Sequence, residues 1–303
     1  MRNRDLRDGR YKEGSYLKLP RSIWVLGFVS MFMDTSSELI HSLLPVFMAT
    51  VLGVSMSAIG FVEGFAEATA AFTKVFSGAL SDQFRKRKPL TVLGYGLAAM
   101  TKPMFPLATS INWVFTARFV DRIAKGIRGA PRDALVAEIA PPQLRGAAFG
   151  LRQALDSVGA FLGPALAIAF MVWFANDMRA VLWVAVLPAF IAVMLLLFGV
   201  KEPELQVPAS VERNIFSLSN TKLLGRRYWL VVAVGTVFGL ARFSEAFLIL
   251  RAQDLGLAIS YVPLVMIVMN VVYSAFAFPA GAAADRWSTY SLLLAGIGLL
   301  VAS

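Results

Sequence analysis

Long apolar segments alternate with short polar connectors along most of the chain. Eight of the segments are long enough, at about 20 residues, to cross the hydrocarbon core of a bilayer as a helix, and a ninth starts near Ser288 and is cut off at Ser303. The eight lie near residues 23–49, 57–80, 90–109, 111–138, 147–174, 180–200, 228–251 and 259–283. This pattern predicts an all-α polytopic membrane protein.

The fourth segment concentrates charge. Residues 118–135, "RFVDRIAKGIRGAPRDAL", hold five basic and two acidic side chains, although one charge at the centre of a membrane helix costs about 2.5–3.5 kcal/mol on insertion scales. With a helical repeat, the seven charges fall on one side and most apolar side chains on the other. The segregation predicts a membrane helix with its charged side toward a polar interior. Pro131 can kink or end that helix, so Arg132 and Asp133 are expected near one mouth of the interior.

Four other segments carry polar stripes at helical spacing. Ionisable side chains within membrane helices normally face a bundle interior or a watery cavity and pair with one another. The stripes consist of Asp34, Glu38 and His41; of Glu63, Glu67 and Lys74; of Arg152, Asp156, Gly159 and Gly163; and of Arg242 and Glu245. They predict a central, roughly neutral cavity lined by segments 1, 2, 4, 5 and 7.

These charges have two possible roles. Asp34, Glu38, Glu63 and Glu67 are candidates for proton binding, and the alternative is that they are permanently ionised partners of the arginines. Candidates for the substrate path are Arg118, Asp121, Lys125, Arg152, Asp156, Arg242 and Glu245. A purely structural pairing of Arg152 with Asp156 stays open, and His41 is expected to be a wall residue.

Composition narrows the class of function. The chain is 57% hydrophobic and only 16% charged, has no cysteine and has one histidine, His41. These counts exclude metal sites built from thiolates or from a histidine cluster, and they exclude Ser-His-Asp catalysis. The sequence also lacks a Gly-rich loop that ends in G-K-[ST], which argues against an ATP-driven pump. We expect neither an enzyme nor a cofactor or metal. The net charge of +10 is spread in short runs between apolar spans, so nucleic acid is not an expected partner.

Orientation follows from the distribution of Lys and Arg. With the N-terminus inside the cell, the inner segments hold eighteen of these residues and the outer loops hold three, namely Lys102, Arg179 and Arg251. The positive-inside rule then predicts a cytoplasmic N-terminus. The expected parts are a tail at 1–22, a six-helix bundle at 23–200, a cytoplasmic linker at 201–227 and a partial second bundle at 228–303.

An internal repeat supports two related bundles. Ser37-Glu38 on the first segment is echoed by Ser244-Glu245 on the seventh, and "FSGALSDQF" after the second by "PAGAAADRW" after the eighth. Repeated halves with a site between them near the midplane are typical of secondary transporters.

Three motifs resemble those of the major facilitator superfamily, and the resemblance covers the chain from the first segment to the ninth. "GALSDQFRKRK" resembles the inner-loop signature G-x-L-x-D-R-x-G-R-K, with matches at Gly78, Leu80, Asp82, Lys86 and Arg87 and departures at Gln83 and Arg85. "RIAKGIRGA" resembles R-x-x-Q-G-x-G of the fourth span, with Lys125 in place of Gln. "GAFLGPALA" resembles the G-x-x-x-G-P signature of the fifth span, which the family associates with antiporters.

The resemblance implies alternating access between two six-helix bundles. Gly78, Asp82, Lys86 and Arg87 would form a gating loop, Arg122 would tune proton coupling, and Gly159, Gly163 and Pro164 would give a closely packed, bendable helix interface. About nine of twelve expected spans are present, so we expect a C-terminal truncation, and the question of an inactive remnant stays open.

The expected function is secondary active transport. The leading hypothesis is proton-coupled efflux by antiport of a small or drug-like molecule, in the inner membrane of a prokaryote and by a monomer. The expected partners are the small-molecule substrate, protons and the lipid bilayer. The alternative is a proton-coupled uptake symporter for a small solute, which the basic residues of the fourth segment would suit if the solute is anionic.

Overall fold

The computed structural model describes residues 19–84, 87–201, 225, 228–230, 232–233, 235–236, 244–273, 291, 294, 296 and 298, without the side chains of 79 and 82–84. Its helices are α1 (Arg21–Val46), α2 (Met56–Phe84), α3 (Arg87–Thr101), α4 (Ile111–Ile139), α5 (Arg145–Trp173), α6 (Met178–Val184), α7 (Val186–Gly199) and α9 (Glu245–Asp254). A further helical stretch spans Ile259–Tyr273. The described residues contain no strand, and the prediction of an all-α fold is confirmed.

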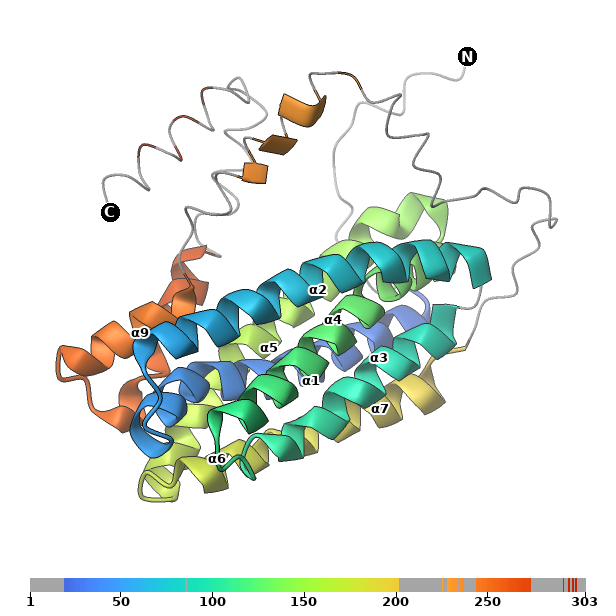
Figure 1. Ribbon diagram of the computed structural model, residues 1–303. Coiled ribbons are helices and arrows are strands. Elements are labelled where there is room, and N and C mark those ends of the chain that lie inside the picture. The colour runs from blue at the N-terminus through green and yellow to red at the C-terminus, as the bar shows by residue number, and fades with distance from the viewer. Residues whose placement is uncertain are drawn as a thin grey trace, which may run out of the picture.

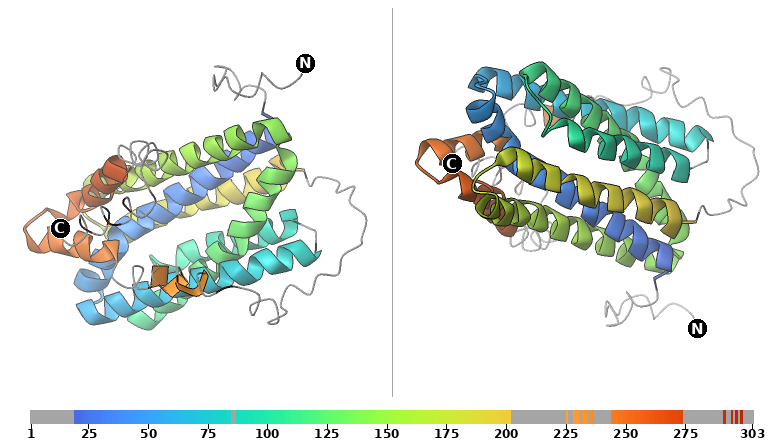
Figure 2. Two further views of the ribbon diagram at one scale, coloured as in Figure 1. Left: turned by 90° about the horizontal axis from the view of Figure 1, so that it is seen from above. Right: turned by 90° about the horizontal axis from the view of Figure 1, so that it is seen from below.

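The helices form two groups side by side (Figures 1 and 2). One group contains α1, which packs against α5 and α7, and the other contains α4, which packs against α2 and α3. We name the two ends of this bundle after α1: the Arg21 end, where α1 begins, and the Val46 end, where it finishes. At the Val46 end, α9 lies against α1 and α2.

Apolar packing is concentrated toward the two ends of the bundle. One cluster of buried side chains includes Leu43, Phe47 and Val114 toward the Val46 end. A second includes Ile23, Val29 and Leu196 toward the Arg21 end. On α1 the two clusters meet at Met33 and Leu39, on either side of Asp34 and Glu38. The hydrophobic cores therefore leave the middle of the bundle to charged groups.

Close packing of α5 on α1 depends on two glycines. A Cβ added at Gly159 would lie 2.5 Å from the carbonyl oxygen of Met31, and one at Gly163 would lie 2.7 Å from the backbone nitrogen of Leu39. Any larger residue would push the two backbones apart, because small residues are what allow membrane helices to approach closely. This contact holds Asp34 and Glu38 of α1 in place along α5.

Two predicted spans are divided in the structure. The span at 180–200 is split into α6 and α7 at Ala185. Pro188 has no N–H to donate to the carbonyl of Val184, and the Ser36 hydroxyl donates to the neighbouring Ala185 carbonyl at 2.6 Å. The expected helix over 228–251 is not continuous either, since α9 begins at Glu245 after the extended residue Ser244, whose hydroxyl accepts from the Ala246 N–H.

The surface of the bundle is rich in apolar side chains. Three helical stretches within the described chain are long and apolar enough to cross a membrane, Arg21–Val51, Pro142–Trp173 and Met178–Gly199. Helices α2 and α4 are also 29 residues long but contain charged residues. Large apolar side chains such as Phe72 and Phe198 are exposed, which suits contact with lipid rather than water.

Candidate functional site: a charged cavity between α1, α2, α4 and α9

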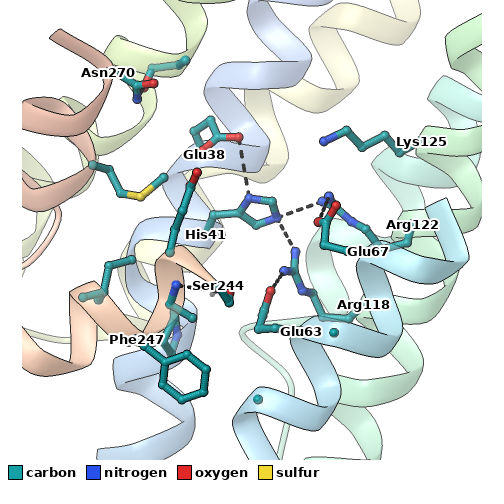
Figure 3. Close-up of a pocket in the computed structure, with 18 residues that line it drawn as sticks. Glu38, His41, Glu63, Glu67, Arg118, Arg122, Lys125, Ser244, Phe247 and Asn270 are labelled. Atoms are coloured by element: carbon teal, nitrogen blue, oxygen red, sulfur yellow. Dashed lines mark hydrogen bonds and ion pairs between the residues drawn. The ribbon is translucent and has the colours of Figure 1, made fainter. Parts of the chain in front are cut away.

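A cavity of about 850 Å³ lies between the two groups of helices. Its charged wall is formed by α1, α2 and α4, and α9 with the following helix closes the other side (Figure 3). The ionisable residues lining it are Glu38, His41, Glu63, Glu67, Arg118, Arg122, Lys125 and Glu245. Glu38 and Glu245 belong to the two echoed Ser-Glu pairs, so both copies of the repeat contribute an acid to the same cavity.

The arginines of α4 are paired with acids of α2. Arg118 donates to a carboxylate oxygen of Glu63, and Arg122 donates to Glu67 at 3.2 Å. Both arginines are almost fully buried, whereas the Glu67 side chain is exposed to the cavity. Burying a guanidinium is costly unless it is paired, so these contacts account for two charges that the sequence places inside the membrane.

His41 links this network to α1. Its Nε2 lies 2.8 Å from a guanidinium nitrogen of Arg122 and also contacts Arg118. Arginine can only donate, so Nε2 accepts and carries no proton. The remaining nitrogen, Nδ1, faces Glu38 Oε1 at 3.6 Å. A continuous polar path therefore runs from Glu38 through His41 to the arginines.

A buried lysine beside the cavity was missed by the sequence reasoning. The prediction placed Lys102 in an outer loop, but its side chain is 1% exposed. Its ammonium lies 2.9 Å from Asp121 Oδ1 and 3.0 Å from the Ser37 hydroxyl. Arg122 contacts the other oxygen of Asp121 at 2.8 Å. Asp121 thus lies between two cations. It is a candidate for the substrate path from the sequence, but in the structure it lines neither of the two cavities described here.

A second cavity of about 370 Å³ continues toward the Arg21 end. Glu38, Glu67 and Lys125 line both cavities. The other ionisable residues lining the second cavity are Asp34, Lys74, Arg128, Arg132 and Asp156. The polar path through the bundle is therefore longer than either cavity alone.

Arg152 and Asp156 form an ion pair on α5. Arg152 donates to Asp156 Oδ2 at 2.6 Å and also lies 3.9 Å from Asp133 of α4. Asp156 lines the second cavity, and Arg152 does not. Arg132 and Asp133 lie beyond Pro131 on α4, which continues as a helix to Ile139. Arg132 lines the second cavity and reaches Ser30 at 3.1 Å.

The expected gating loop is described in part. Gly78 lies on α2, and a Cβ there would be 3.4 Å from the Cβ of Ala130 on α4. Arg87 donates to Glu138 at 3.0 Å and to the Ser81 hydroxyl at 2.6 Å, which joins α2, α3 and α4 at the Arg21 end. Lys86, Arg242 and the side chain of Asp82 lie outside the described part of the chain.

Three contacts join the first six predicted spans to the residues after 244, two of them at the Val46 end and the third, from Asn270, at the level of Glu38. Phe247 packs on Gly60, where an added Cβ would lie 2.9 Å from its ring. Ser260 donates to Asn176 at 2.6 Å. Asn270 donates to the carbonyl of Ala160 at 3.2 Å, which is the carbonyl that loses its helical N–H partner at Pro164. The cavity is thus closed on this side by contacts from α9 and the following helix.

No group of three or more His, Cys, Asp or Glu side chains in the described ranges is arranged to hold a metal ion. Instead, acids of α1 and α2 face cations of α4 across the cavity. The arrangement suits the binding of a small polar molecule and the movement of protons between carboxylates more than it suits bond-making chemistry.

The chain is similar to several membrane transporters. It is 33% identical over 287 residues to an uncharacterised MFS-type transporter of Methanocaldococcus jannaschii, covering 92% of this chain and 70% of that one. It is 28% identical over 148 residues to a multidrug resistance protein of Photorhabdus laumondii, covering 49% of this chain and 34% of that protein.

Solved structures share the fold at low identity. An inward-facing bacterial homologue of the human lysosomal transporter Spinster superimposes with a TM-score of 0.67 at 15% identity, over 88% of this chain and 62% of that one. A D-xylose-proton symporter gives a TM-score of 0.61 at 18% identity, over 88% and 69%. The chain therefore spans about two thirds of the length of these transporters.

The family model for the Major Facilitator Superfamily matches residues 23–303. Helices, motifs and relatives agree, and the chain belongs to the major facilitator superfamily of membrane transporters.

Proposed function

We propose that the protein exports a small or drug-like molecule in exchange for protons, by alternating access across the inner membrane of a prokaryote. The observation that carries the proposal is the cavity in which acids of α1 and α2 face cations of α4. A relative named as a multidrug resistance protein supports export, and we propose that the chain works as a monomer.

The proton carriers are the acids that lack an arginine partner. Glu63 and Glu67 are each paired with an arginine of α4, and protonating either one would break an ion pair. Within the described part of the chain, the ion-pair contact of Glu38 is with His41, at 3.6 Å. Asp34 makes no ion pair with any residue that the structure describes. We therefore assign proton binding to Glu38 and Asp34.

Arg118 and Arg122 take a different role in this proposal. They hold His41 with Nε2 as an acceptor and so fix the ring beside Glu38. A proton that arrives at Glu38 meets a neutral imidazole and a fixed positive field, rather than a mobile counter-ion. Arg122 thereby influences proton binding without binding the proton.

Exchange follows if the proton and the substrate use the same carboxylates. A proton on Glu38 or Asp34 excludes a cationic group of the substrate, and release of the proton to the cytoplasm lets that group bind. The cytoplasmic side is assigned to the Arg21 end by the positive-inside distribution. In this assignment the Val46 end, where Phe247 and Ser260 make their contacts, faces outward and is closed.

The test uses proteoliposomes and three aromatic probes: the permanent cation trimethylphenylammonium, the strong-acid anion benzenesulfonate, and phenylalanine, which is a zwitterion near neutral pH. Because each probe stays charged near neutral pH, none redistributes across a pH gradient as a neutral weak acid or base would. With an acidic lumen, an antiporter accumulates its substrate inside the vesicles. We expect uptake of at least one probe, and its loss when an ionophore collapses the gradient.

Glu38→Gln is the decisive variant for proton coupling. We expect gradient-driven uptake to fall to the level of protein-free liposomes, because the amide cannot bind the proton, while exchange of labelled for unlabelled probe without a gradient continues at a higher probe concentration, with Asp34 as the remaining carboxylate. Asp254→Asn is the matched control, since Asp254 is an exposed acid outside both cavities. Equal gradient-driven uptake by Glu38→Gln and the wild type would refute the assignment.

The runner-up function is uptake by proton symport, which the cations of the cavity favour for an anionic solute. The same vesicles separate the two functions. Accumulation with an alkaline lumen, rather than an acidic one, would establish symport and overturn export.

A further inference from the structure

The wall of the second cavity contains cations that have no acidic partner. Four acids line this cavity, Asp34, Glu38, Glu67 and Asp156, together with four cations, Lys74, Lys125, Arg128 and Arg132. The numbers of acids and cations are equal, but the acids and cations are not paired with one another. Glu67 is taken by Arg122, Asp156 by Arg152, and Arg132 by Asp133.

Lys125 and Arg128 are the unpaired cations of α4. Neither makes an ion pair with any residue of the described ranges. Arg128 is 5% exposed, and one of its terminal nitrogens is buried with no hydrogen-bond partner among the residues that the structure describes. The guanidinium lies 5.0 Å from the centre of the Tyr95 ring, which supports the cation on one side. A buried guanidinium donor without an acceptor is costly, so this site is built for an anion that comes from elsewhere.

The two cations are placed to act together. They are three residues apart on α4, a spacing that puts side chains on one face of a helix. Lys125 also lines the larger cavity, where its amine points into the open space opposite Glu38 (Figure 3). An acidic group bound here would lie where the two cavities meet.

Asp34 provides the complementary half of the site. It lines the same cavity, comes from α1 on the opposite group of helices, and has no ion-pair partner among the residues the structure covers. Glu38, one turn further along α1, has its ion-pair contact with His41 and makes none with an arginine or lysine of the described ranges. Among the described residues that line this cavity, the charges without an oppositely charged partner are thus Lys125 and Arg128 on α4, the more exposed Lys74 on α2, and the two acids on α1.

We propose that the transported molecule is a zwitterion, with an acidic group bound by Lys125 and Arg128 and a cationic group bound by Asp34 and Glu38. This inference rests on the proposed transport function and specifies its substrate class. It also gives exchange a physical basis, because the cationic group and the proton compete for the same two carboxylates.

Binding to purified protein in phosphatidylcholine nanodiscs tests the proposal without requiring transport. We expect phenylalanine, as zwitterionic probe, to bind about ten-fold or more tightly than benzenesulfonate or trimethylphenylammonium, since it alone satisfies both charged groups. Equal or tighter binding of either singly charged probe would overturn the zwitterion, as would no binding by all three.

Crossed variants separate recognition from a structural effect. Lys125→Gln and Arg128→Gln should each weaken phenylalanine and benzenesulfonate about ten-fold or more and leave trimethylphenylammonium unchanged. Asp34→Asn should weaken phenylalanine and trimethylphenylammonium and spare benzenesulfonate. Lys201→Gln, at an exposed lysine after α7, is the control. A variant that fails to fold would bind all three probes more weakly. Lys125→Arg keeps the positive charge, and we expect it to retain phenylalanine binding.

Two further outcomes assign a failure to its source. If phosphatidylglycerol in the nanodiscs displaces benzenesulfonate, Lys125 and Arg128 bind a lipid headgroup, and the substrate assignment is wrong. If phenylalanine binds with the crossed pattern but is not moved in proteoliposomes, the binding site stands and the transport proposal fails.

Discussion

A single buried carboxylate organises the charges next to the cavity. Asp121 is 1% exposed and contacts Lys102 and Arg122, which are equally buried. Removing one partner from a buried ion pair strands the other charge, and that costs more than the pair itself contributes. We therefore interpret Asp121 as a structural anchor that holds Arg122 in place.

Asp121→Asn should lower stability strongly. We expect a loss of about 3–5 kcal/mol, seen as a lower midpoint of thermal unfolding in detergent. Adding Lys102→Met to Asp121→Asn should cost less than the two single changes summed, because the stranded lysine is gone. Asp254→Asn is the control, and strict additivity of the two single changes would contradict the coupling.

Most charged residues of the cavity are predictable from the sequence, but the burial of Lys102 is not. Helical spacing alone puts Arg118, Arg122 and Lys125 on one face of α4, and the structure places all three on the cavity. Lys102 sits in a short connector, where hydropathy does not distinguish a buried lysine from an exposed one. Its burial depends on Asp121, nineteen residues away, and on Ser37 of α1. Pairings of this kind depend on tertiary contacts that no local pattern contains.

At the scale of elements, the contact between α1 and α5 sets the position of the acids. A Cβ at Gly163 would lie 2.8 Å from both the Glu38 Cβ and the Thr35 carbonyl oxygen. These neighbours are backbone or close to it and cannot move without displacing α1. The interface therefore admits no side chain at this position.

Gly163→Ala should destabilise the protein despite the better helix propensity of alanine. We expect a loss of about 1–3 kcal/mol from overpacking, read as a lower unfolding midpoint. Gly150→Ala in the same helix is the matched control, because a Cβ there meets nothing within 4 Å. That control should be neutral or gain up to about 1 kcal/mol. Equal effects of the two substitutions would argue against the tight α1–α5 contact.

Element boundaries were predictable where polar connectors flank a segment with a continuous helical repeat. The expected span at 111–138 corresponds to α4 at Ile111–Ile139, and Pro131 does not end it. The interruption before Glu245 was not predicted, because no proline or glycine lies next to Ser244 in "RFSEAFLIL". The cap is made by a serine hydroxyl and a local backbone N–H, and serine is also found within membrane helices, so its presence does not predict a helix start.

At the scale of the whole molecule, the contacts at the Val46 end define one state of the transporter. Asn176 and Ser260 belong to different predicted bundles and meet at 2.6 Å. Phe247 of α9 packs on Gly60 of α2 at the same end. In alternating access these contacts must break for the cavity to open on this side.

Linking Asn176 to Ser260 should stop transport reversibly. The chain has no native cysteine, so Asn176→Cys with Ser260→Cys gives a clean pair for a short bifunctional methanethiosulfonate. We expect the crosslinked protein to lose uptake in proteoliposomes and to regain it on reduction, while phenylalanine still binds. Each single cysteine variant serves as a control. Full uptake by the crosslinked protein would show that this end need not open.

The chain contains one histidine, and the structure places it in the cavity between Glu38 and the two arginines of α4. Selective ¹⁵N labelling of histidine in this chain therefore yields a single imidazole spectrum, with no assignment step. Its two nitrogen shifts report the tautomer directly. A proton or ligand that changes the contacts of His41 with Glu38 or the two arginines can be followed through that one ring.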